Sequence, residues 1–317
     1  MNNPPEFLVE LVTQSHGYFI QAGSLVMQGK TQFQKIAIFD TPALGRVLRL
    51  DDVFMTSEKD EFFYHENLIH PAAITHPAPR QALVIGGGDG GAAEELLKHA
   101  GMERVVLAEL DNGVIEACRR YLPAIHGGVF DDPRLHLAIG DGRKLVETTK
   151  DSFDLIALDL TDPRGPSQAL YTHEFYSACS RRLTPHGLLS LHVESPLSSP
   201  QVYARIIATL RSVFPIVRPY LVYIPLYGTW WGMATASHQQ DPLTLTPEEV
   251  RRRIRDRGLT ALQFYNEATH HAVFALPGFV QNILASPAPP FFDASPPLED
   301  DLDFTGASTL RVIVENP

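Results

Sequence analysis

A glycine-rich turn and three acidic residues at the ends of apolar runs form the most informative pattern in this chain. The turn spans residues 86–91 and contains Asp89, while Glu109 and Asp159 each close a later apolar run. Ligands of an open α/β sheet bind at the carboxyl ends of its parallel strands. We therefore expect Asp89, Glu109 and Asp159 to meet in one crevice, and that crevice to be negatively charged.

The spacing of this turn matches the dinucleotide-binding fingerprint, but its charge argues against a phosphate ligand. Gly86, Gly88 and Gly91 fit the pattern G-x-G-x-x-G, and Glu109 follows about 20 residues later, where an acid that binds a ribose is expected. Asp89 stands where a pyrophosphate would bind, and negative groups repel each other at short range. The pattern favours a nucleoside without phosphates, such as S-adenosylmethionine or a relative with a cationic sulfonium, over NAD.

A second acidic pair follows the apolar run 153–158. Asp159 ends that run, and Asp162 follows in a loop punctuated by Pro163 and Pro166. Such residues often do no more than terminate a loop, but this loop follows a strand end that faces the expected ligand. Carboxylates can bind an ammonium, and burial raises a carboxylate's pKa toward the range of a general base. A primary amine in water is an ammonium with a pKa of about 10.4 if it resembles lysine, and it must lose a proton before it can attack. Since the carboxylates can bind this cation and one can take its proton, we interpret the acceptor as a polyamine.

Three motifs together resemble the spermidine synthase family of polyamine aminopropyltransferases. They are residues 50–66 (LDDVFMTSEKDEFFYHE), the turn 86–91 and the segment 159–166, which agree with the family in order and spacing. The resemblance extends from about Gln34 to Ala285. It implies an enzyme that transfers the aminopropyl group of decarboxylated S-adenosylmethionine to an amine, without a metal or other cofactor, and releases methylthioadenosine.

The resemblance also implies roles for individual residues. Glu109 would bind the ribose hydroxyls, and Asp141 the adenine amino group. Asp89 would bind the aminopropyl ammonium, and Asp159 would be the proton acceptor. Further nucleoside contacts would come from Gln34, Gly142 and Pro166, and the acceptor amine would be oriented by Tyr64, His65, Asp162 and Tyr227.

The residues expected near the acceptor depart from the family pattern. Met55 stands where many relatives have Gln, Leu226 stands where they have Thr, and the stretch 227–232 is shorter and more aromatic than usual. A channel lined by Met55, Leu226 and Trp230 favours a longer methylene chain, because each buried methylene contributes about 0.8 kcal/mol. Putrescine, which would give spermidine, is the expected acceptor, and cadaverine, agmatine and spermidine remain alternatives.

Two other functions are compatible with parts of the pattern. A methyltransferase that uses S-adenosylmethionine itself would share the fold, but Asp89 would then face the carboxylate of the methionine. A polyamine-binding relative without catalysis is disfavoured because both Asp159 and Asp162 are present. Product analysis with each nucleoside separates these alternatives.

Composition limits the partners of the chain. It has 317 residues, of which 44% are hydrophobic, and its formal net charge is −11. An acidic protein of this kind is not expected to bind nucleic acid, and it suits cationic metabolites.

Cys118 and Cys179 form neither a disulfide framework nor a metal set, which indicates the reducing cytoplasm. No signal sequence or membrane-spanning run is apparent, and the pair His270-His271 is interpreted as structural because no further ligand lies at a zinc spacing.

The order of strand-like and helix-like patterns predicts the architecture. Runs at 7–12, 33–40 and 46–50 predict a small antiparallel β domain over residues 1–56, through which we expect a homodimer or homotetramer to form. Residues 57–285 alternate strands and helices, which predicts an α/β, doubly wound, methyltransferase-like (Rossmann-like) domain whose last strands pair as a hairpin. A helix should begin at Thr246-Pro247.

Residues 286–317 form a Pro- and Asp-rich tail that we expect to be poorly ordered, with a strand-like run at 310–314. The strands of the large domain are expected at 82–86, 104–109, 135–139, 155–159, 188–193, 217–224 and 232–236.

Overall fold

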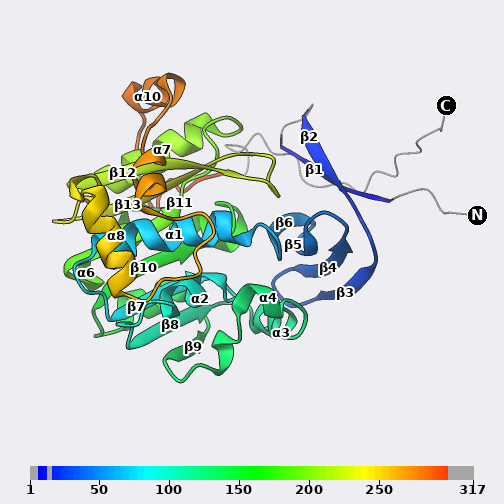
Figure 1. Cartoon of the computed structure of the whole chain (residues 1–317). Helices are drawn as coiled ribbons and strands as arrows, with labels where there is room; N and C mark the ends of the chain where they lie inside the picture. Colours follow the sequence, from blue (N-terminus) through cyan, green and yellow to red (C-terminus); the bar gives the residue numbers. More distant parts are fainter. Residues whose placement is uncertain (1–5, 13–15, 299–317) are drawn as a thin grey trace, which may run out of the picture.

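The computed structural model describes residues 6–12 and 16–298, and these residues form a small all-β part beside a large α/β domain (Figure 1). The β part contains a hairpin, β1 paired with β2, and a four-stranded antiparallel sheet in the order β3-β4-β5-β6. This confirms a small N-terminal antiparallel β part, although sequence patterns revealed only three of its six strands, β1, β4 and β5. The six strands are β1 (Phe7–Leu11), β2 (Gly17–Gln21), β3 (Leu25–Lys30), β4 (Lys35–Thr41), β5 (Gly45–Leu50) and β6 (Val53–Ser57).

The large domain is built on one seven-stranded sheet with the order β12-β13-β11-β10-β7-β8-β9. The five strands from β11 to β9 in that order are parallel, and β13 is antiparallel to both β11 and β12. The predicted doubly wound sheet with a terminal hairpin is therefore confirmed. Its strands are β7 (Gln81–Gly86), β8 (Arg104–Glu109), β9 (Leu135–Ile139), β10 (Phe153–Asp159), β11 (Leu183–His192), β12 (Ile216–Ile224) and β13 (Thr229–Ser237).

Helices cover both faces of this sheet, because alternate residues of the central strands point to opposite sides. On β7, Ala82 and Val84 join a core with helices α1 (Glu61–Thr75) and α2 (Gly91–Leu97). Leu83 and Ile85 join the opposite core with α6 and α7. The other helices are α3 (Asn112–Tyr121), α4 (Pro123–His126), α5 (Gly142–Thr148), α6 (His173–Arg182), α7 (Pro200–Arg211), α8 (Pro247–Asp256), α9 (Glu267–Ala272) and α10 (Gly278–Ala285), with 3₁₀ turns at Val129–Asp131, Gly165–Leu170 and Pro242–Thr244.

Helix α8 begins where the sequence predicted. Thr246 is its N-cap, and the Thr246 hydroxyl accepts a hydrogen bond from the amide of Glu249 at 3.2 Å. Pro247 occupies the first helical position, where its missing N–H leaves no donor unsatisfied. In the described part of the chain, no helix combines the length and the apolar character needed to cross a membrane.

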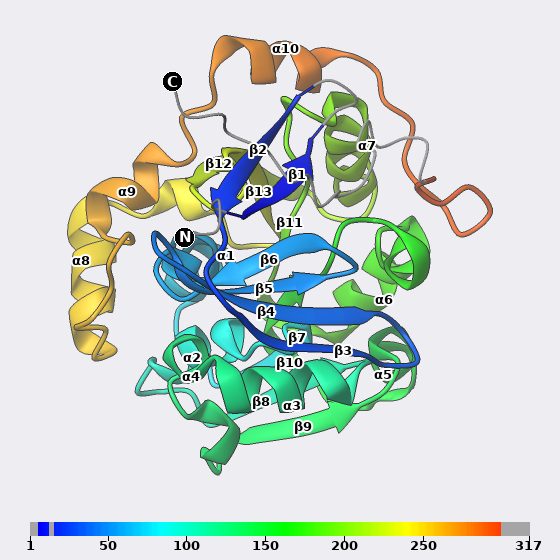
Figure 2. The same cartoon turned by 90° about the vertical axis from the view of Figure 1, so that its right-hand side faces the viewer.

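The N-terminal strands lie across the carboxyl ends of the parallel strands, and in Figure 2 strands β3–β6 lie in front of the main sheet. Two side chains from this part bind Asp111 just beyond β8: the Thr31 hydroxyl donates at 2.6 Å and the Gln34 amide at 3.0 Å. Strands β7 and β10 are neighbours in the sheet. From β7 the chain first adds β8 and β9 on one side and later adds β10 and β11 on the other. Doubly wound sheets bind ligands at this switch point. The small β part therefore covers the expected binding crevice.

The segment that follows α10 has a defined conformation with buried positions at Phe291 and Pro297, so the expectation of poor order is wrong for residues 286–298. Phe291 is fully buried, and its amide donates to the Thr209 hydroxyl at 2.9 Å. The Asp293 carboxylate accepts two hydrogen bonds from the Arg143 guanidinium, at 2.8 and 2.6 Å. One aromatic anchor and one bidentate ion pair hold a segment whose composition alone suggested disorder. The run 310–314 lies outside the described residues.

Candidate active site

The glycine turn after β7 allows three strand ends to meet. Gly86 and Gly87 have φ values of +80° and +68°, which favour glycine. The Gly87 amide donates to the Asp159 carbonyl at 2.9 Å, and a Cβ on Gly87 would lie 2.8 Å from Asp159 Oδ2. A Cβ on Gly88 would lie 3.1 Å from Glu109 Oε2. Side chains in the turn would push these carboxylates away, so the glycines make room for both acids.

Asp159 lies at the end of β10 with the properties of a general base. Burial, together with the negative charge of Asp89, raises the pKa of Asp159 to about 7, and His65 and Tyr64 only partly oppose this increase. Its Oδ2 atom is enclosed and has no hydrogen-bond partner. A carboxylate with a pKa near neutrality and a free oxygen can accept a proton from a bound amine.

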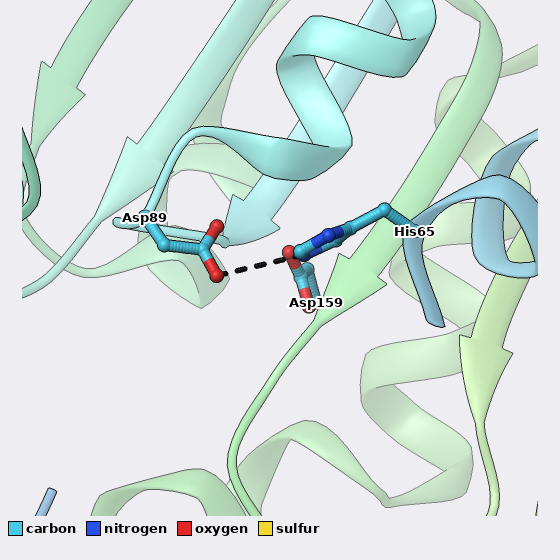
Figure 3. A group of neighbouring side chains, drawn as sticks. All are labelled: His65, Asp89 and Asp159. Atoms are coloured by element: carbon cyan, nitrogen blue, oxygen red, sulfur yellow. Dashed lines mark ion pairs between the residues drawn. The ribbon is translucent and has the colours of Figure 1, made fainter. Parts of the chain in front are cut away.

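Asp89 and His65 form an ion pair inside the crevice (Figure 3). His65 Nε2 lies 3.5 Å from Asp89 Oδ2, and the Gly91 amide donates to Asp89 Oδ1 at 2.9 Å. Burial alone would raise the pKa of Asp89, but His65 and the Gly91 amide lower it below its ordinary value. Burial alone would lower the pKa of His65, but Asp89 and Glu61 raise it well above its ordinary value. The pair is therefore charged, with the imidazolium beside the carboxylate.

The residues expected to bind the nucleoside lie at or after the ends of β8, β9 and β10, with one residue from the N-terminal part. Glu109 Oε1 accepts a hydrogen bond from the Asp111 amide at 2.8 Å, and burial raises the pKa of Glu109 to about 7. Asp141 caps α5 and accepts hydrogen bonds from the amides of residues 143 and 144. A Cβ on Gly142 would lie 2.5 Å from the Ile85 side chain, so glycine permits the approach of α5 to β7. Gln34 binds Asp111 from the N-terminal part, and Pro166 lies in the 3₁₀ turn 165–170.

A cavity extends from Tyr64 toward the N-terminal hairpin. Tyr64, Asp162 and Tyr227, which the sequence analysis placed at the acceptor, all line it. The Tyr227 hydroxyl donates to the Met55 carbonyl at 2.6 Å, which holds the ring in place. Burial and the charge of Asp159 raise the pKa of Tyr64 well above its ordinary value, so Tyr64 stays a neutral phenol. Asp159 and His65, the latter also expected at the acceptor, are not among the residues that line this cavity. Tyr64 lines it and contacts both, through a hydrogen bond with the Asp159 carboxylate and an edge-to-face contact with the His65 ring.

Sequence reasoning missed two buried carboxylates in this cavity, Glu10 and Glu194. Glu10 comes from β1, and burial raises its pKa to about 7, although the Phe54 amide opposes this. Glu194 follows β11; burial and the neighbouring Asp162 raise its pKa well above its ordinary value. Glu194 has a φ of +68°, and such backbone conformations cost roughly 1–3 kcal/mol and cluster at functional sites. Neither residue belongs to a motif that the sequence makes visible.

Two of the three residues predicted to set acceptor length do not line the cavity. Met55 lines it, but Leu226 is 1% exposed within the core between the sheet and α1. Trp230 is 47% exposed and packs against Tyr223, while its neighbour Trp231 lines the cavity. Adjacent residues of a strand point to opposite faces, so the wall is formed by the second tryptophan.

Three side chains of the site could also hold a metal ion. One ligand atom each from His65, Asp89 and Asp159 lie within 4.8 Å of one another. A nitrogen and two carboxylate oxygens suit a metal ion, and the two carboxylates suit an organic ammonium equally well. The absence of a metal requirement, which the family resemblance implies, stays a prediction. The pair His270-His271 has no such surroundings, because His270 is bound to the Tyr265 hydroxyl and the Pro242 carbonyl.

Comparisons with known proteins agree with this geometry. Residues 61–246 match the model of the spermine/spermidine synthase domain, and residues 12–58 match the spermidine synthase tetramerisation domain. The polyamine aminopropyltransferase of Nitrosomonas europaea is 50% identical over 97% of this chain and 95% of its own length. That of Moorella thermoacetica is 39% identical over 88% of this chain and 96% of its own length.

Solved structures give the same result. A spermidine synthase crystallised with the transition-state analogue AdoDATO superposes with a TM-score of 0.83 at 38% identity, covering 90% of this chain and 97% of its own. The spermidine synthase of Thermotoga maritima superposes with a TM-score of 0.81 at 36% identity, covering 90% and 96%. This chain belongs to the spermine/spermidine synthase family, whose members are polyamine aminopropyltransferases.

Proposed function

We propose that this protein transfers the aminopropyl group of decarboxylated S-adenosylmethionine to putrescine and releases spermidine and methylthioadenosine. The observation that supports this most directly is the position of Asp159, a carboxylate with a pKa of about 7. It contacts the glycine turn at Gly87 and, on another side, Tyr64, a residue of the cavity lined by further carboxylates. A dicationic nucleoside and a dicationic amine both match this charge. The relatives named polyamine aminopropyltransferase point to the same reaction.

In the proposed reaction, Asp159 takes a proton from the acceptor ammonium, which frees a lone pair on its nitrogen. That nitrogen attacks the methylene carbon next to the sulfonium, so a C–N bond forms while the C–S bond breaks. The sulfur leaves as a neutral thioether. Glu109 would bind the ribose, and Asp89 would bind the ammonium of the aminopropyl group.

The cavity suits the second ammonium of a diamine. Glu10, Asp162 and Glu194 gather there, and Trp231 and Tyr227 provide aromatic walls whose ring centroids lie 5.0 Å apart. One cation, Arg164, also lines the cavity and acts on Glu194. Three acidic groups therefore face one guanidinium, and burying the excess negative charge is costly unless a further cation compensates it. A diamine would place one ammonium at Asp159 and the other among these acids, with its methylenes against the rings.

Product analysis tests the proposal. Purified protein is incubated with decarboxylated S-adenosylmethionine or with S-adenosylmethionine, and with putrescine, cadaverine, agmatine or spermidine, and the products are identified by mass spectrometry. We expect spermidine and methylthioadenosine from the first nucleoside with putrescine. Methylated products from S-adenosylmethionine would contradict the proposal and indicate a methyltransferase.

The nucleoside preference supplies an independent test by calorimetry. Decarboxylated S-adenosylmethionine presents an ammonium near Asp89, whereas S-adenosylmethionine adds a carboxylate there, and like charges in a partly desolvated site repel each other. The decarboxylated form should bind far more tightly. Equal affinities would contradict the role of Asp89.

We also propose that the protein assembles as a homodimer or homotetramer through its N-terminal strands, where the tetramerisation-domain model matches. Both cysteines, Cys118 and Cys179, are buried and free. Free thiols persist in reducing compartments, and we propose that the enzyme acts in the cytoplasm.

A further inference from the structure

A loop of the N-terminal β part contacts a residue beside Glu109, the acid proposed to bind the ribose. The loop connects β3 to β4 and contains Thr31 and Gln34, which lie 80 and 77 positions before Asp111 in the chain. Thr31 Oγ1 donates to Asp111 Oδ2 at 2.6 Å, and Gln34 Nε2 donates to the same oxygen at 3.0 Å. Asp111 itself is buried. Two donors from one part of the molecule therefore converge on one carboxylate oxygen of the other part.

The Thr31 hydroxyl has a single proton, and its surroundings direct that proton toward Asp111. The hydroxyl oxygen accepts hydrogen bonds from the amides of Phe33 and Gln34, at 3.1 and 3.2 Å. The Gln34 carbonyl lies 3.3 Å from this oxygen, farther away than the Asp111 carboxylate. A hydrogen bond to an ionised acceptor is also stronger than one to a neutral carbonyl. The loop therefore presents an oriented donor to Asp111.

Glycine at position 113 allows this loop to approach the first turn of α3. A Cβ on Gly113 would lie 2.5 Å from Thr31 Cγ2, so only glycine permits this packing. The Gly113 amide donates to Asp111 Oδ1 at 3.0 Å, which makes Asp111 the N-cap of α3. Asp111 is thus held at both carboxylate oxygens, by the helix on one side and by the loop on the other.

The backbone of Asp111 in turn holds the side chain of Glu109. The Asp111 amide donates to Glu109 Oε1 at 2.8 Å. The other oxygen, Oε2, is directed at the glycine turn, because it lies 3.1 Å from the position that a Cβ on Gly88 would take. The hydrogen bond at Oε1 therefore keeps Oε2 facing the turn where the nucleoside is expected to bind.

We propose that the β3–β4 loop, acting through Thr31 and Asp111, positions Glu109 for recognition of the ribose hydroxyls. This inference rests on the proposed function, in which Glu109 binds the ribose. Residues 12–58, which include the loop, match the tetramerisation domain. The same region therefore serves the nucleoside site in addition to any role in assembly. Thr31 and Asp111 are positioning residues, since they act on the ribose through Glu109.

Loss of the Thr31 hydroxyl should affect the ribose and leave the adenine contacts unchanged. Without that donor, the Asp111 carboxylate shifts toward its remaining partners, and the amide that holds Glu109 shifts with it. Glu109 then meets the ribose hydroxyls in a poorer geometry. Asp141, expected to bind the adenine, follows β9 and has no contact with the loop. The expected signature is therefore a loss of selectivity for the hydroxyls.

Two nucleosides that differ only in these hydroxyls test the inference. Methylthioadenosine and its 2′,3′-dideoxy analogue are titrated by calorimetry at pH 8.5, above the pKa of about 7 of Glu109, so that this carboxylate is ionised. Wild type should prefer methylthioadenosine by roughly 10- to 100-fold, the range expected for hydrogen bonds to a charged group. Thr31→Val, which removes the hydroxyl at nearly constant size, should lower this ratio by about threefold or more. Thr31→Ser keeps the hydroxyl and should retain the wild-type ratio.

Two further variants complete the design. Thr41→Val makes the same substitution in the same β part, where the Thr41 hydroxyl donates to the Gly45 carbonyl at 2.8 Å, and it should leave the ratio at the wild-type value. Gly113→Ala inserts a methyl group between the loop and α3, so it should lower the ratio as Thr31→Val does. Gly113→Ala also decides the matter if Thr31→Val fails to fold.

An unchanged ratio would overturn the inference. If Thr31→Val weakens both nucleosides equally, the loop has only a structural role. A wild type that binds both nucleosides equally would remove the role of Glu109 and the inference with it. Either result can occur in an enzyme that still forms spermidine, which leaves the proposed reaction intact. Failure to form any aminopropylated product would instead contradict the proposed function.

Discussion

At the scale of single residues, the site separates two nearby carboxylates by their surroundings. Burial raises the pKa of both Asp89 and Asp159, but only Asp89 has an imidazolium and a backbone amide close enough to reverse this effect. Asp89 is therefore ionised and suited to bind a cation, while Asp159 is suited to exchange a proton. Such opposed shifts commonly mark different roles for neighbouring acids.

Replacing Asp159 by Asn should lower turnover by roughly 10² to 10⁴, because the amide cannot accept the proton. Nucleoside affinity should change little. In wild type, turnover should rise as pH increases through about 7, since Asp159 must lose its proton to act as a base. Steady-state assays from pH 6 to 8.5 measure both effects. Near-normal turnover of the variant, or a flat wild-type profile, would contradict the assignment.

Acceptor length should depend on Met55 and not on Leu226. Met55 lines the cavity, so Met55→Gln should shift the preference from cadaverine toward putrescine by about fourfold, the equivalent of one buried methylene. Trp230→Phe, on the exposed face of β13, is the matched control and should leave the ratio unchanged. Competition assays with both diamines give the ratio. An unaltered ratio in Met55→Gln would show that this side chain does not select chain length.

At the scale of elements, helix α1 connects the two parts of the molecule. Just before it, Asp60 accepts hydrogen bonds from the Ser57 hydroxyl and the Leu226 amide, which ties the N-terminal part to the loop that carries Tyr227. Within it, Tyr64 and His65 face the site. The next residue, Glu66, accepts hydrogen bonds from the amides of residues 263, 264 and 265. One short stretch therefore fixes both the site and the chain that surrounds it.

The segment after α10 should contribute to stability through its buried aromatic ring. Phe291 is fully buried, with the Arg205 guanidinium 3.8 Å from its centroid, so Phe291→Ala should cost about 3 kcal/mol of unfolding free energy. Phe292, its 39% exposed neighbour, is the control, and Phe292→Ala should have a small effect. Urea denaturation measures both. Equal stability of the two variants would show that the segment is not part of the cooperative fold.

At the scale of the whole molecule, exposed apolar side chains on the N-terminal strands are the expected contact between subunits. Phe19 of β2 is 64% exposed and Leu25 of β3 is 50% exposed. If subunits associate there, Phe19→Asp and Leu25→Asp should reduce the assembled mass measured by light scattering. Leu243→Asp, at a 47% exposed position in the large domain, should not. A wild-type monomer, or assembly that survives both changes, would refute this interface.

The sequence by itself determined the class of the fold and which acidic residues meet at the strand ends. Alternating apolar runs predicted the doubly wound sheet, because strands buried on both faces must be apolar throughout. The glycine turn and the acids Asp89, Glu109 and Asp159 could be identified from the sequence for a similar reason. They stand at strand ends, and the carboxyl ends of parallel strands meet at one edge, so local position implies spatial proximity.

Only the tertiary structure decided what lines the cavity beside Tyr64. Glu10 and Glu194 lie 184 positions apart in the chain, and no local pattern brings them together. The choice between Trp230 and Trp231 depends on which face of β13 meets the cavity, and a one-residue error reverses every side chain of a strand. Likewise, Phe291 and Asp293 anchor a Pro-rich segment through partners on α5 and α7. Composition describes what a segment contains, whereas the fold determines which partners are within its reach.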